Sequence, residues 1–360
     1  MTDIERVIVD SRYPDYSLPF IVAEKCGVPC ETKTKESVVA DFSDLSPGEK
    51  FSRAGKTLFF TENRGRFLKK CPGSRGVVCC NYYTINSVTG CPFDCSYCIL
   101  QHYIANNPFI NIFLNREVVF SEMKEFLEKH RRLRVGTGEL ADSLALDNLI
   151  DESGFFLKGI SSHNMAKNVQ FELKTKSCRV EGLIIAHEKF PDVNTVAGFS
   201  VNIPKFTENE ELHTASMDKR IEAMNKVMEK GIPVALHFDP VVMIPEFFNS
   251  YKLLVRNIFQ SLRKKNIAWI SMGGFRHAIA MKDVIRKRFP ASSLLKGEMF
   301  PGKDDGKMRY PAAVRRRFYG MMKKEINRHM ENPPLYMCME KSFIWKDIEM
   351  NPRDISGGLF

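Results

Sequence analysis

The 360-residue sequence lacks long apolar runs, and no stretch approaches the roughly 18 apolar residues that a membrane-spanning helix needs. Its first residues, MTDIERVIVDSRYPDY, also lack the basic segment followed by an apolar one that is typical of a signal peptide. Internal repeats, low-complexity tracts and long Pro- or Ser-rich linkers are missing as well. These absences predict a cytoplasmic protein without a membrane segment, built as one elaborated domain.

Hydrophobic residues make up 44% of the chain and charged residues 27%, which excludes a disordered chain and a disulfide-stapled mini-domain. The chain contains 10 cysteines. Because the cytosol keeps thiols reduced, we expect these cysteines to be free thiols or metal ligands rather than disulfides.

The net charge of +10 lies in the last third of the chain. Residues 251–360 hold 23 Lys and Arg against 10 Asp and Glu, whereas residues 1–250 hold 30 against 33. The basic clusters in this third include RKK (263–265), RKR (286–288) and RRR (315–317). Such clustering is typical of a surface that binds a polyanion, so we expect DNA to contact this part. The alternative is that each cluster is a solvated helix face.

From about residue 80 the chain alternates apolar strand-like runs with helical patterns, which predicts a parallel sheet with helical crossovers. The six runs are YYTINSV (82–88), RLRVGT (132–137), VQFELKTK (169–176), VAGFSVNI (196–203), PVALHFDPVV (233–242) and IAWISMG (267–273). The best-marked helix follows Ser216, and Gly231 lies just past its end. In such folds the chemistry lies at the carboxyl ends of the strands, and we expect the site there.

Three cysteines follow the first of these runs in a C-x3-C-x2-C spacing, namely Cys91, Cys95 and Cys98. Three thiolates so close in sequence can bind one [4Fe-4S] cluster and leave its fourth iron open to a ligand that is not protein. A structural zinc site is the alternative, but it needs a fourth ligand such as Cys71, Cys79 or Cys80. Cysteines like these upstream three are more often buried small hydrophobes, and a redox role stays open for them.

An ordered series of motifs runs through most of the chain. The motifs are CPG (71–73), CC (79–80), CPFDCSYCILQ (91–101), FELKTKS (171–177), GFSVN (198–202) and SMDKRIEA (216–223). Together they resemble the spore photoproduct lyase family of radical S-adenosylmethionine (SAM) enzymes, over about residues 15–330. The resemblance implies an α/β fold with an incomplete (β/α)6 radical-SAM-type barrel at 81–290. An N-terminal extension at 1–80 would pack on the barrel, and a basic hairpin and helical region would follow at 291–360.

The resemblance also implies residues that bind the cofactors. In the family, the open iron chelates SAM, which is split to methionine and a 5′-deoxyadenosyl radical. Lys176, at the end of VQFELKTK, is similar to a lysine that meets the methionine carboxylate. Ser200 and Asn202, on one face of the next run, match positions directed toward the cofactor. Glu139, in GTGE (136–139), would accept from the methionine ammonium, although a plain strand-to-helix turn explains this segment equally well.

The residues that return a hydrogen atom in the family are only partly present. Aligning GTGELADSLALD with the family pattern puts Gly136 where the true lyases carry a hydrogen-donor cysteine. The two tyrosines that flank the last cluster cysteine in the family correspond to Tyr97, which is retained, and Ile99, which is not. Tyr97 is therefore the candidate catalytic residue of a partial relay, or it packs beside the cluster.

The segment DGKMRYP (305–311) resembles a family hairpin that wedges beside a flipped lesion, with Arg309 and Tyr310 as its basic and aromatic pair. The resemblance implies a lyase that cleaves a carbon–carbon bond of a thymine-dimer lesion in DNA, with a flavodoxin or ferredoxin as electron donor. Two alternatives stay open. One is a radical SAM enzyme for an RNA base or a peptide, and the other is a nucleic-acid-binding iron–sulfur protein without radical chemistry.

Overall fold

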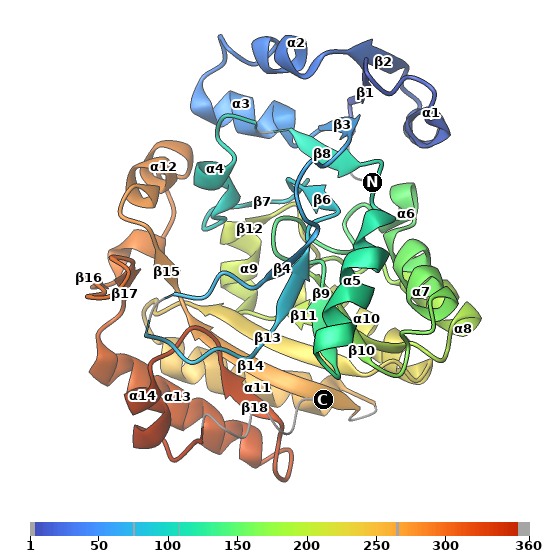
Figure 1. Ribbon diagram of the computed structural model, residues 1–360. Helices are drawn as coiled ribbons and strands as arrows, with labels where there is room; N and C mark the ends of the chain where they lie inside the picture. The colour runs from blue at the N-terminus through green and yellow to red at the C-terminus, as the bar shows by residue number, and fades with distance from the viewer. Residues whose placement is uncertain (1–3, 75, 108, 264–265, 352–360) are drawn as a thin grey trace.

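Two mostly parallel sheets organise the chain in the computed structural model, which describes residues 4–74, 76–107, 109–263 and 266–351 (Figure 1). The larger sheet has the order β18-β14-β13-β11-β10-β9-β5-β4, and only the β4–β5 pair is antiparallel. Its strands are β4 (Leu68–Lys70), β5 (Tyr83–Ile85), β9 (Leu133–Gly136), β10 (Val169–Thr175), β11 (Asn194–Ser200), β13 (Val234–Val241), β14 (Ile267–Gly274) and β18 (Leu335–Met337). The sheet curls into an incomplete barrel, which confirms the predicted fold class.

All six predicted runs form strands of this sheet, and helices connect them. The helices that follow the barrel strands are α5 (Val118–Lys129), α6 (Asp147–Ile150), α7 (Glu152–Ser162), α8 (Glu181–Lys189), α9 (Pro204–Glu210), α10 (Met217–Glu229), α11 (Phe247–Ser261) and α13 (Ala312–Asn327). Helix α10 begins as predicted, because the Ser216 side chain accepts from the backbone N–H of Lys219. The chain turns after it at Gly231, where φ is +87°.

Each barrel strand has an apolar outer face and a polar inner face, because successive side chains point to opposite sides. On β10, Phe171 and Leu173 pack into the main hydrophobic core. Glu172 lies on the opposite face and binds His237 of β13 inside the barrel. The same alternation directs the lysines two and four residues beyond Glu172 toward the interior at the carboxyl end of β10.

The smaller sheet lies at the top of Figure 1 and has the strand order β2-β1-β3-β8-β6. Its strands are β1 (Arg6–Asp10), β2 (Cys30–Lys33), β3 (Thr57–Thr61), β6 (Val88–Thr89) and β8 (Ile110–Phe113). Its helices are α1 (Ser17–Cys26), α2 (Lys35–Ala40) and α3 (Pro47–Ala54). Since β6 and β8 come from beyond residue 80 and β4 joins the barrel sheet, strand pairing crosses the predicted boundary in both directions. That boundary stays a prediction.

The C-terminal part contains the expected hairpin. Strands β16 (Phe300–Pro301) and β17 (Met308–Arg309) pair antiparallel, and β17 also pairs with β15 (Arg276–His277). The remaining elements here are α12 (Met281–Arg288), a short 3-10 helix at Leu294–Lys296, and α14 (Ser342–Asp347). Within the described ranges, no helix has both the length and the apolar character needed to cross a membrane.

The open side of the barrel is closed by the segment that precedes β5. The Val78 N–H donates to the carbonyl oxygen of Glu340, just after β18, at 2.9 Å. The CPG and CC motifs therefore lie along the seam between the two edges of the sheet. Sequence reasoning missed both edge strands, β4 and β18, which have three residues each.

Candidate active site at the barrel mouth

The three cysteines of the C-x3-C-x2-C motif come together on the loop that carries β7 (Asp94–Cys95). They pack in one small cluster formed by Cys91, Phe93, Cys95, Tyr97, Cys98 and Ala145. Cys95 is buried, and the other two cysteines are half-buried. Each thiol lies within electrostatic reach of the other two. The structure thus brings together the three predicted ligands.

The donor set of this loop fits an iron–sulfur cluster. Across the described part of the chain, no three His, Cys, Asp or Glu side chains gather closely enough to hold a single metal ion. The ligands of a [4Fe-4S] cluster bind separate irons, so the three thiols need not meet at one point. Burial raises the pKa of all three thiols, and ligation would therefore release their protons. Cluster ligation stays a prediction that this geometry supports.

Two side chains from outside the loop fix its backbone and its acidic residue. The Gln101 amide, on α4 (Leu100–Tyr103), donates to the carbonyl oxygens of Cys95 and Ser96 at 3.1 and 2.9 Å. Arg288, at the end of α12, donates from Nη2 to both carboxylate oxygens of Asp94 at 2.9 and 3.0 Å. Only 6% of the Arg288 side chain is exposed, so this ion pair is shielded from solvent.

Glu210 forms a second anchor for the loop. Its backbone carbonyl accepts from the N–H of Ser96 at 2.8 Å, and its carboxylate accepts from the Ser96 hydroxyl. The same carboxylate accepts from the Ser292 hydroxyl at 2.7 Å and from the Ser293 N–H at 2.8 Å. The loop is thereby tied to two segments that lie far away in the sequence.

The cysteine loop is linked to the ends of β10 and β11 by a polar network. The Tyr97 hydroxyl donates to Glu211 of β12 (Glu211–Leu212), which pairs with β7. Arg220, whose side chain is fully buried, donates to Glu211 at 2.6 Å and to the carbonyl oxygen of Ser200 at 2.8 Å. The Lys176 ammonium donates to the Ser200 hydroxyl at 3.4 Å and lies 5.8 Å from the Tyr97 ring centroid. The cysteine loop, Tyr97, Lys176 and Ser200, which the sequence predicts as parts of the site, therefore lie next to one another.

The charge of Lys176 is held by its surroundings. Burial alone would lower the pKa of Lys176, but Cys95 and Glu211 offset this effect, and the pKa is raised. Its backbone N–H donates to Asp142 at 2.6 Å, and Asp142 also accepts from the Thr175 hydroxyl. A fixed cation thus lies beside the cysteine loop, where an anionic group of a ligand can meet it.

The remaining predicted cofactor residues lie at the mouth with protein partners of their own. Glu139 accepts from the Thr84 hydroxyl at 2.6 Å. The Asn202 amide donates to the carbonyl oxygen of Pro240 at 2.9 Å and accepts from the Tyr251 hydroxyl at 2.7 Å. Roles for these two side chains as cofactor ligands stay predictions.

Close packing around position 136 explains why the residue there is glycine. A Cβ atom there would lie 2.1 Å from the Tyr82 hydroxyl oxygen and 2.4 Å from the carbonyl oxygen of Glu172. Both distances are far below van der Waals contact, and one of the atoms belongs to the backbone. A cysteine placed here would therefore displace β10 or Tyr82, because no side chain fits in the space present.

A buried triad lies in the barrel below the mouth. The imidazole of His237 binds Glu172 through Nε2 at 2.5 Å and Ser271 through Nδ1 at 2.7 Å. Burial lowers the pKa of His237, so the ring is neutral at pH 7. Burial alone would raise the pKa of Glu172, but the groups around it, His237 first and then Arg134 and Lys174, lower it to about 2. The triad is thus a carboxylate held by a neutral imidazole.

Neither member of the predicted lesion-binding pair is free in this structure. The Arg309 guanidinium binds both carboxylate oxygens of Asp305 at 2.6 Å. Tyr310 is 4% exposed and accepts from the Met243 N–H at 3.2 Å, and burial raises its pKa to about 12. A contact of either side chain with a flipped base requires these bonds to open, and the contact stays a prediction. The exposed aromatic of the hairpin is Phe300, at 52%.

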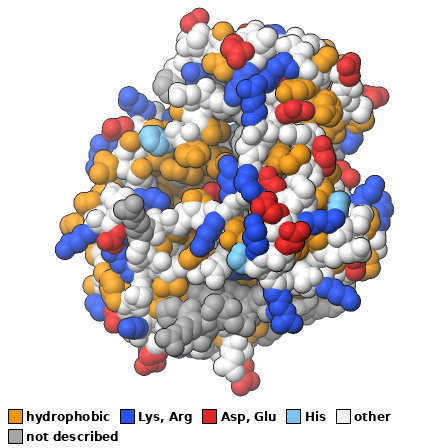
Figure 2. Space-filling model, viewed as in Figure 1, with side chains coloured by type: hydrophobic (Ala, Val, Ile, Leu, Met, Phe, Trp, Pro, Cys, Tyr) orange, Lys and Arg blue, Asp and Glu red, His pale blue; other side chains and the backbone are white. Residues whose placement is uncertain are grey.

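The basic clusters differ from the open patch that the charge count suggests. Arg315 of RRR is buried and pairs with Glu340. Arg316 pairs with Asp347 at 3.0 Å, and Arg263 of RKK pairs with Glu229 at 2.7 Å. Residues 264–265 of RKK lie outside the described residues. On the face in Figure 2, Lys and Arg side chains are interspersed with acidic and apolar ones. Which surface of this third contacts DNA stays a prediction.

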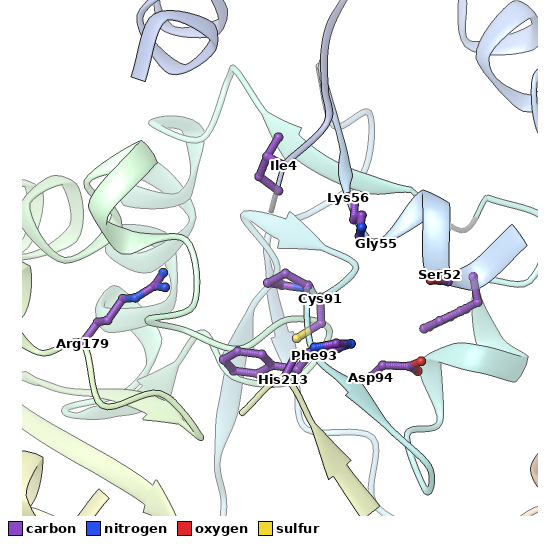
Figure 3. A pocket seen from close by; sticks show the side chains of 11 residues that line it. Ile4, Ser52, Gly55, Lys56, Cys91, Phe93, Asp94, Arg179 and His213 are labelled. Atoms are coloured by element: carbon purple, nitrogen blue, oxygen red, sulfur yellow. The ribbon is translucent and has the colours of Figure 1, made fainter. Parts of the chain in front are cut away.

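A pocket of about 200 Å³ reaches Cys91 from the outside of the cysteine loop. Figure 3 shows Cys91 and His213 close together, with Arg179 extending toward them. Lys56 lines the same pocket and pairs with Glu5 at 2.6 Å. The pocket therefore connects one predicted cluster ligand to the surface of the protein.

Sequence reasoning missed the side chains that hold the site together, which are Glu210, Glu211, Arg220 and Arg288. A signal existed for Arg220, because it lies on the same face of its helix as Met217, Ile221 and Met224, which are all buried. A charged residue on an apolar face indicates a buried ion pair. No comparable signal pointed to Glu210, Glu211 or Arg288.

Comparison with known proteins gives one consistent result. Residues 15–335 match the family model described as spore photoproduct lyase. Two curated relatives carry the name spore photoproduct lyase. The relative from Clostridium acetobutylicum is 25% identical over 59% of this chain and 62% of its own length. The one from Bacillus subtilis is 24% identical over 59% of this chain and 61% of its own length. These matches thus span less than two thirds of the relatives.

The fold matches solved structures over nearly the whole chain. A spore photoproduct lyase complexed with dinucleoside spore photoproduct superposes with a TM-score of 0.79 and 20% identity, over 93% of this chain and 100% of the other. A mutant with bound AdoMet and dinucleoside spore photoproduct gives a TM-score of 0.78 and 20% identity, over 93% and 98% of the two chains. The curled sheet and its connections are therefore those of these structures.

Proposed function

The chain belongs to the spore photoproduct lyase family, and from this premise we propose that it is a radical SAM lyase that cleaves the spore photoproduct, a thymine-dimer lesion, in DNA. The observation that carries the proposal is the single connected site at the barrel mouth. Three thiols, a fixed lysine and a strand-end serine are joined there by Tyr97, Glu211 and Arg220. Such a site can hold a cluster and an amino-acid group next to each other.

Each residue has a role that follows from its contacts. Cys91, Cys95 and Cys98 would bind three irons of a [4Fe-4S] cluster. Lys176 and Ser200 would hold the methionine carboxylate of SAM, because a half-buried cation and a hydroxyl suit that anion. When bound, these cofactors supply the 5′-deoxyadenosyl radical that takes a hydrogen atom from the substrate. Glu139 would accept from the methionine ammonium.

The substrate part of the proposal draws on the solved relatives, two of which hold a dinucleoside spore photoproduct. The hairpin β16–β17 lies beside the mouth, and its loop side chain Lys307 donates to Ser74 of the seam segment at 3.1 Å. A lesion that enters the mouth would meet this hairpin together with the cations of the inner wall. Cleavage of the carbon–carbon bond that joins the two thymines is the proposed reaction.

The cluster also needs an electron, and we place its entry at the pocket that reaches Cys91. The pocket lies outside the cysteine loop and is lined by Arg179 and His213, which suit an acidic one-electron carrier such as a flavodoxin or ferredoxin. An electron delivered there reaches the cluster without passing through the substrate mouth.

The decisive test is product analysis under anaerobic conditions. The protein is reconstituted with iron and sulfide, reduced with dithionite, and incubated with SAM and dinucleoside spore photoproduct. We expect the lesion to be converted to two separate thymidines and 5′-deoxyadenosine to appear. Cleavage of SAM with an intact lesion would point to another substrate. A full cluster without any SAM cleavage would point to a binding protein.

The three ligand cysteines are tested against a matched cysteine. Cys91→Ala, Cys95→Ala and Cys98→Ala should each lose the cluster absorption and the formation of 5′-deoxyadenosine. Cys26→Ala removes a half-buried thiol at the end of α1, far along the chain from the loop, and should keep both. Full iron content in all three loop variants would refute the ligand assignment.

A further inference from the structure

The barrel interior is built in layers, because inward-facing residues recur at every second position of each strand. The buried triad marks one layer. Two residues farther along each strand, toward the mouth, the alternation places Lys174 after Glu172 and Asp239 after His237. On β18, Tyr336 faces inward, since its hydroxyl accepts from Arg134 at 3.3 Å. Two residues beyond Tyr336 is Cys338, whose side chain therefore faces the same interior.

The thiol of Cys338 is held by two charged side chains. Its backbone N–H continues the ladder to β14 by donating to the carbonyl oxygen of Met272 at 2.7 Å. Nη2 of Arg276 lies 4.0 Å from the sulfur, and Asp239 lies close enough for its charge to raise the pKa of Cys338. Arg276 and Asp239 pair with each other at 3.3 Å. Cys338, Asp239 and Arg276 thus form a triangle of neighbouring side chains. Cys338 is half-buried at the carboxyl end of its strand.

Asp239 has room for this position only because the facing residue on β14 is glycine. A Cβ atom on Gly273 would lie 2.6 Å from the Asp239 carboxylate. The arrangement of Asp239, Arg276 and Cys338 is therefore specified by three neighbouring strands at once. None of these residues takes part in the network around the cysteine loop.

The triangle lies at the carboxyl ends of the barrel strands, which form the mouth. Burial lowers the pKa of Lys307 on the hairpin loop, and the charge of Arg276 adds to this effect. The charge of Lys174 acts on both Asp239 and Cys338. By the strand alternation, Cys338 lies in the same inner layer as Lys174 and Asp239, one layer below Lys176.

We propose that Cys338 is the hydrogen-atom donor to the carbon radical left on the product after the lesion bond breaks, with Asp239 and Arg276 as its positioning residues. The inference rests on the proposed function. Among protein side chains the thiol S–H bond is weak, and it is weaker than the C–H bond that forms on the product. To donate a hydrogen atom, the sulfur of Cys338 must also be a protonated thiol and not a thiolate. Burial and the Asp239 carboxylate raise the pKa of Cys338 and keep it a thiol at neutral pH.

The atoms and electrons of this step balance. The S–H bond of Cys338 breaks homolytically, and a C–H bond forms on the product carbon. The sulfur is left as a thiyl radical. One electron from the flavodoxin- or ferredoxin-type reductant that the proposed function already requires, together with one proton from water, restores the thiol.

The test follows the transferred hydrogen. In D₂O the thiol carries deuterium, so one of the two thymidines that the wild type releases from the lesion should gain one deuterium, detected by mass spectrometry. Cys338→Ala should still consume the lesion and form 5′-deoxyadenosine, but deuterium transfer should fall at least tenfold and side products should rise. Cys80→Ala, which removes the neighbouring thiol at the seam, should behave like the wild type.

Three results would overturn the proposal. Deuterium transfer by Cys338→Ala at the wild-type level removes Cys338 from the reaction. Loss of transfer in Cys80→Ala but not in Cys338→Ala assigns the step to Cys80. An intact lesion in the wild type, with SAM cleaved, refutes the proposed function and this inference with it.

A second readout needs neither cluster nor SAM. In the protein as isolated, alkylation of Cys338 by N-ethylmaleimide is followed by peptide mass spectrometry with and without dinucleoside spore photoproduct. We expect the lesion to slow labelling of Cys338 severalfold and to leave Cys26 unchanged. Equal labelling of Cys338 with and without the lesion contradicts its place in the substrate site. Cys338→Ser, which keeps the size of the side chain, repeats the deuterium test if the alanine variant unfolds.

Discussion

Replacing Arg220 with methionine gives the sharpest test of how the site is held. Methionine keeps most of the side-chain stem but removes the guanidinium, which donates to Glu211, Thr214 and the carbonyl oxygens of Ser200 and Ala215. The carboxylate of Glu211 is then left buried, with Tyr97 as its remaining side-chain partner among the described residues. Breaking one half of a buried ion pair costs about 3–5 kcal/mol.

This loss can be converted into a melting temperature. With an unfolding entropy of about 2.1 cal/mol/K per residue, about 3–5 kcal/mol lowers the melting temperature of a 360-residue chain by about 4–7 °C. The assay is thermal unfolding followed by circular dichroism at pH 7, together with iron content after reconstitution. The iron content should fall, because the cysteine loop loses its link to β11.

The matched control is Arg263→Met. Arg263 pairs with Glu229 at 2.7 Å, but its side chain is 72% exposed. Exposed ion pairs contribute about 0–1 kcal/mol, so this variant should melt within about 1 °C of the wild type. Arg220→Met combined with Glu211→Gln should recover part of the loss, because the unpaired charge is gone. A loss below about 1 kcal/mol for Arg220→Met, or no recovery in the double variant, would refute the reasoning.

Three further predictions concern other parts of the molecule. Gly136→Cys should lower the melting temperature and reduce lesion repair rather than raise it, and Tyr82→Phe in the same chain should restore part of the stability, because the hydroxyl is the nearest obstacle. The pKa of Glu172 is lowered from 4.5 to about 2, so this carboxylate stabilises the fold above pH 4.5. Urea unfolding should show that this contribution to the free energy of unfolding is lost between pH 4.5 and 2. In Glu172→Gln the free energy of unfolding should depend less on pH. Arg315→Gln should lower the melting temperature by several degrees, whereas Arg316→Gln, which opens an exposed pair, should not; equal effects would contradict the burial of Arg315.

The elements of the barrel could be predicted from the sequence because each one carries its own local pattern. The strand runs and the helix capped at Ser216 depend on alternation, periodicity and end signals, which lie within a window of about 10 residues. The three-residue strand β18 has no such pattern, and it forms only because β14 offers a free edge beside it. The proximity of the three cysteines could be predicted for the same reason, since their spacing is local, and their role as cluster ligands stays a prediction.

The charges could not be assigned from the sequence in the same way. The basic excess of the last third suggested an open patch, but Arg288 and Arg315 turn inward and pair with Asp94 and Glu340. Whether a basic side chain faces solvent or a buried carboxylate depends on partners from distant segments. Tyr310 illustrates the same limit, because nothing in the hairpin motif shows that the tertiary packing buries its ring.

The anchoring of the cysteine loop has a consequence for how the protein is made. Ser96 can form its hydrogen bond only after Glu210, 114 residues later, has been synthesised. Asp94 can form its ion pair only after Arg288, 194 residues later, has been synthesised. At about 5–20 residues per second, translation reaches Arg288 about 10–40 s after Asp94. Until then the cysteine loop lacks its contacts with Glu210 and Arg288, and its three thiols are accessible to solvent and oxygen. Cluster insertion is therefore expected to follow the synthesis of Arg288, and the yield of holoprotein should depend on how well the nascent thiols are shielded.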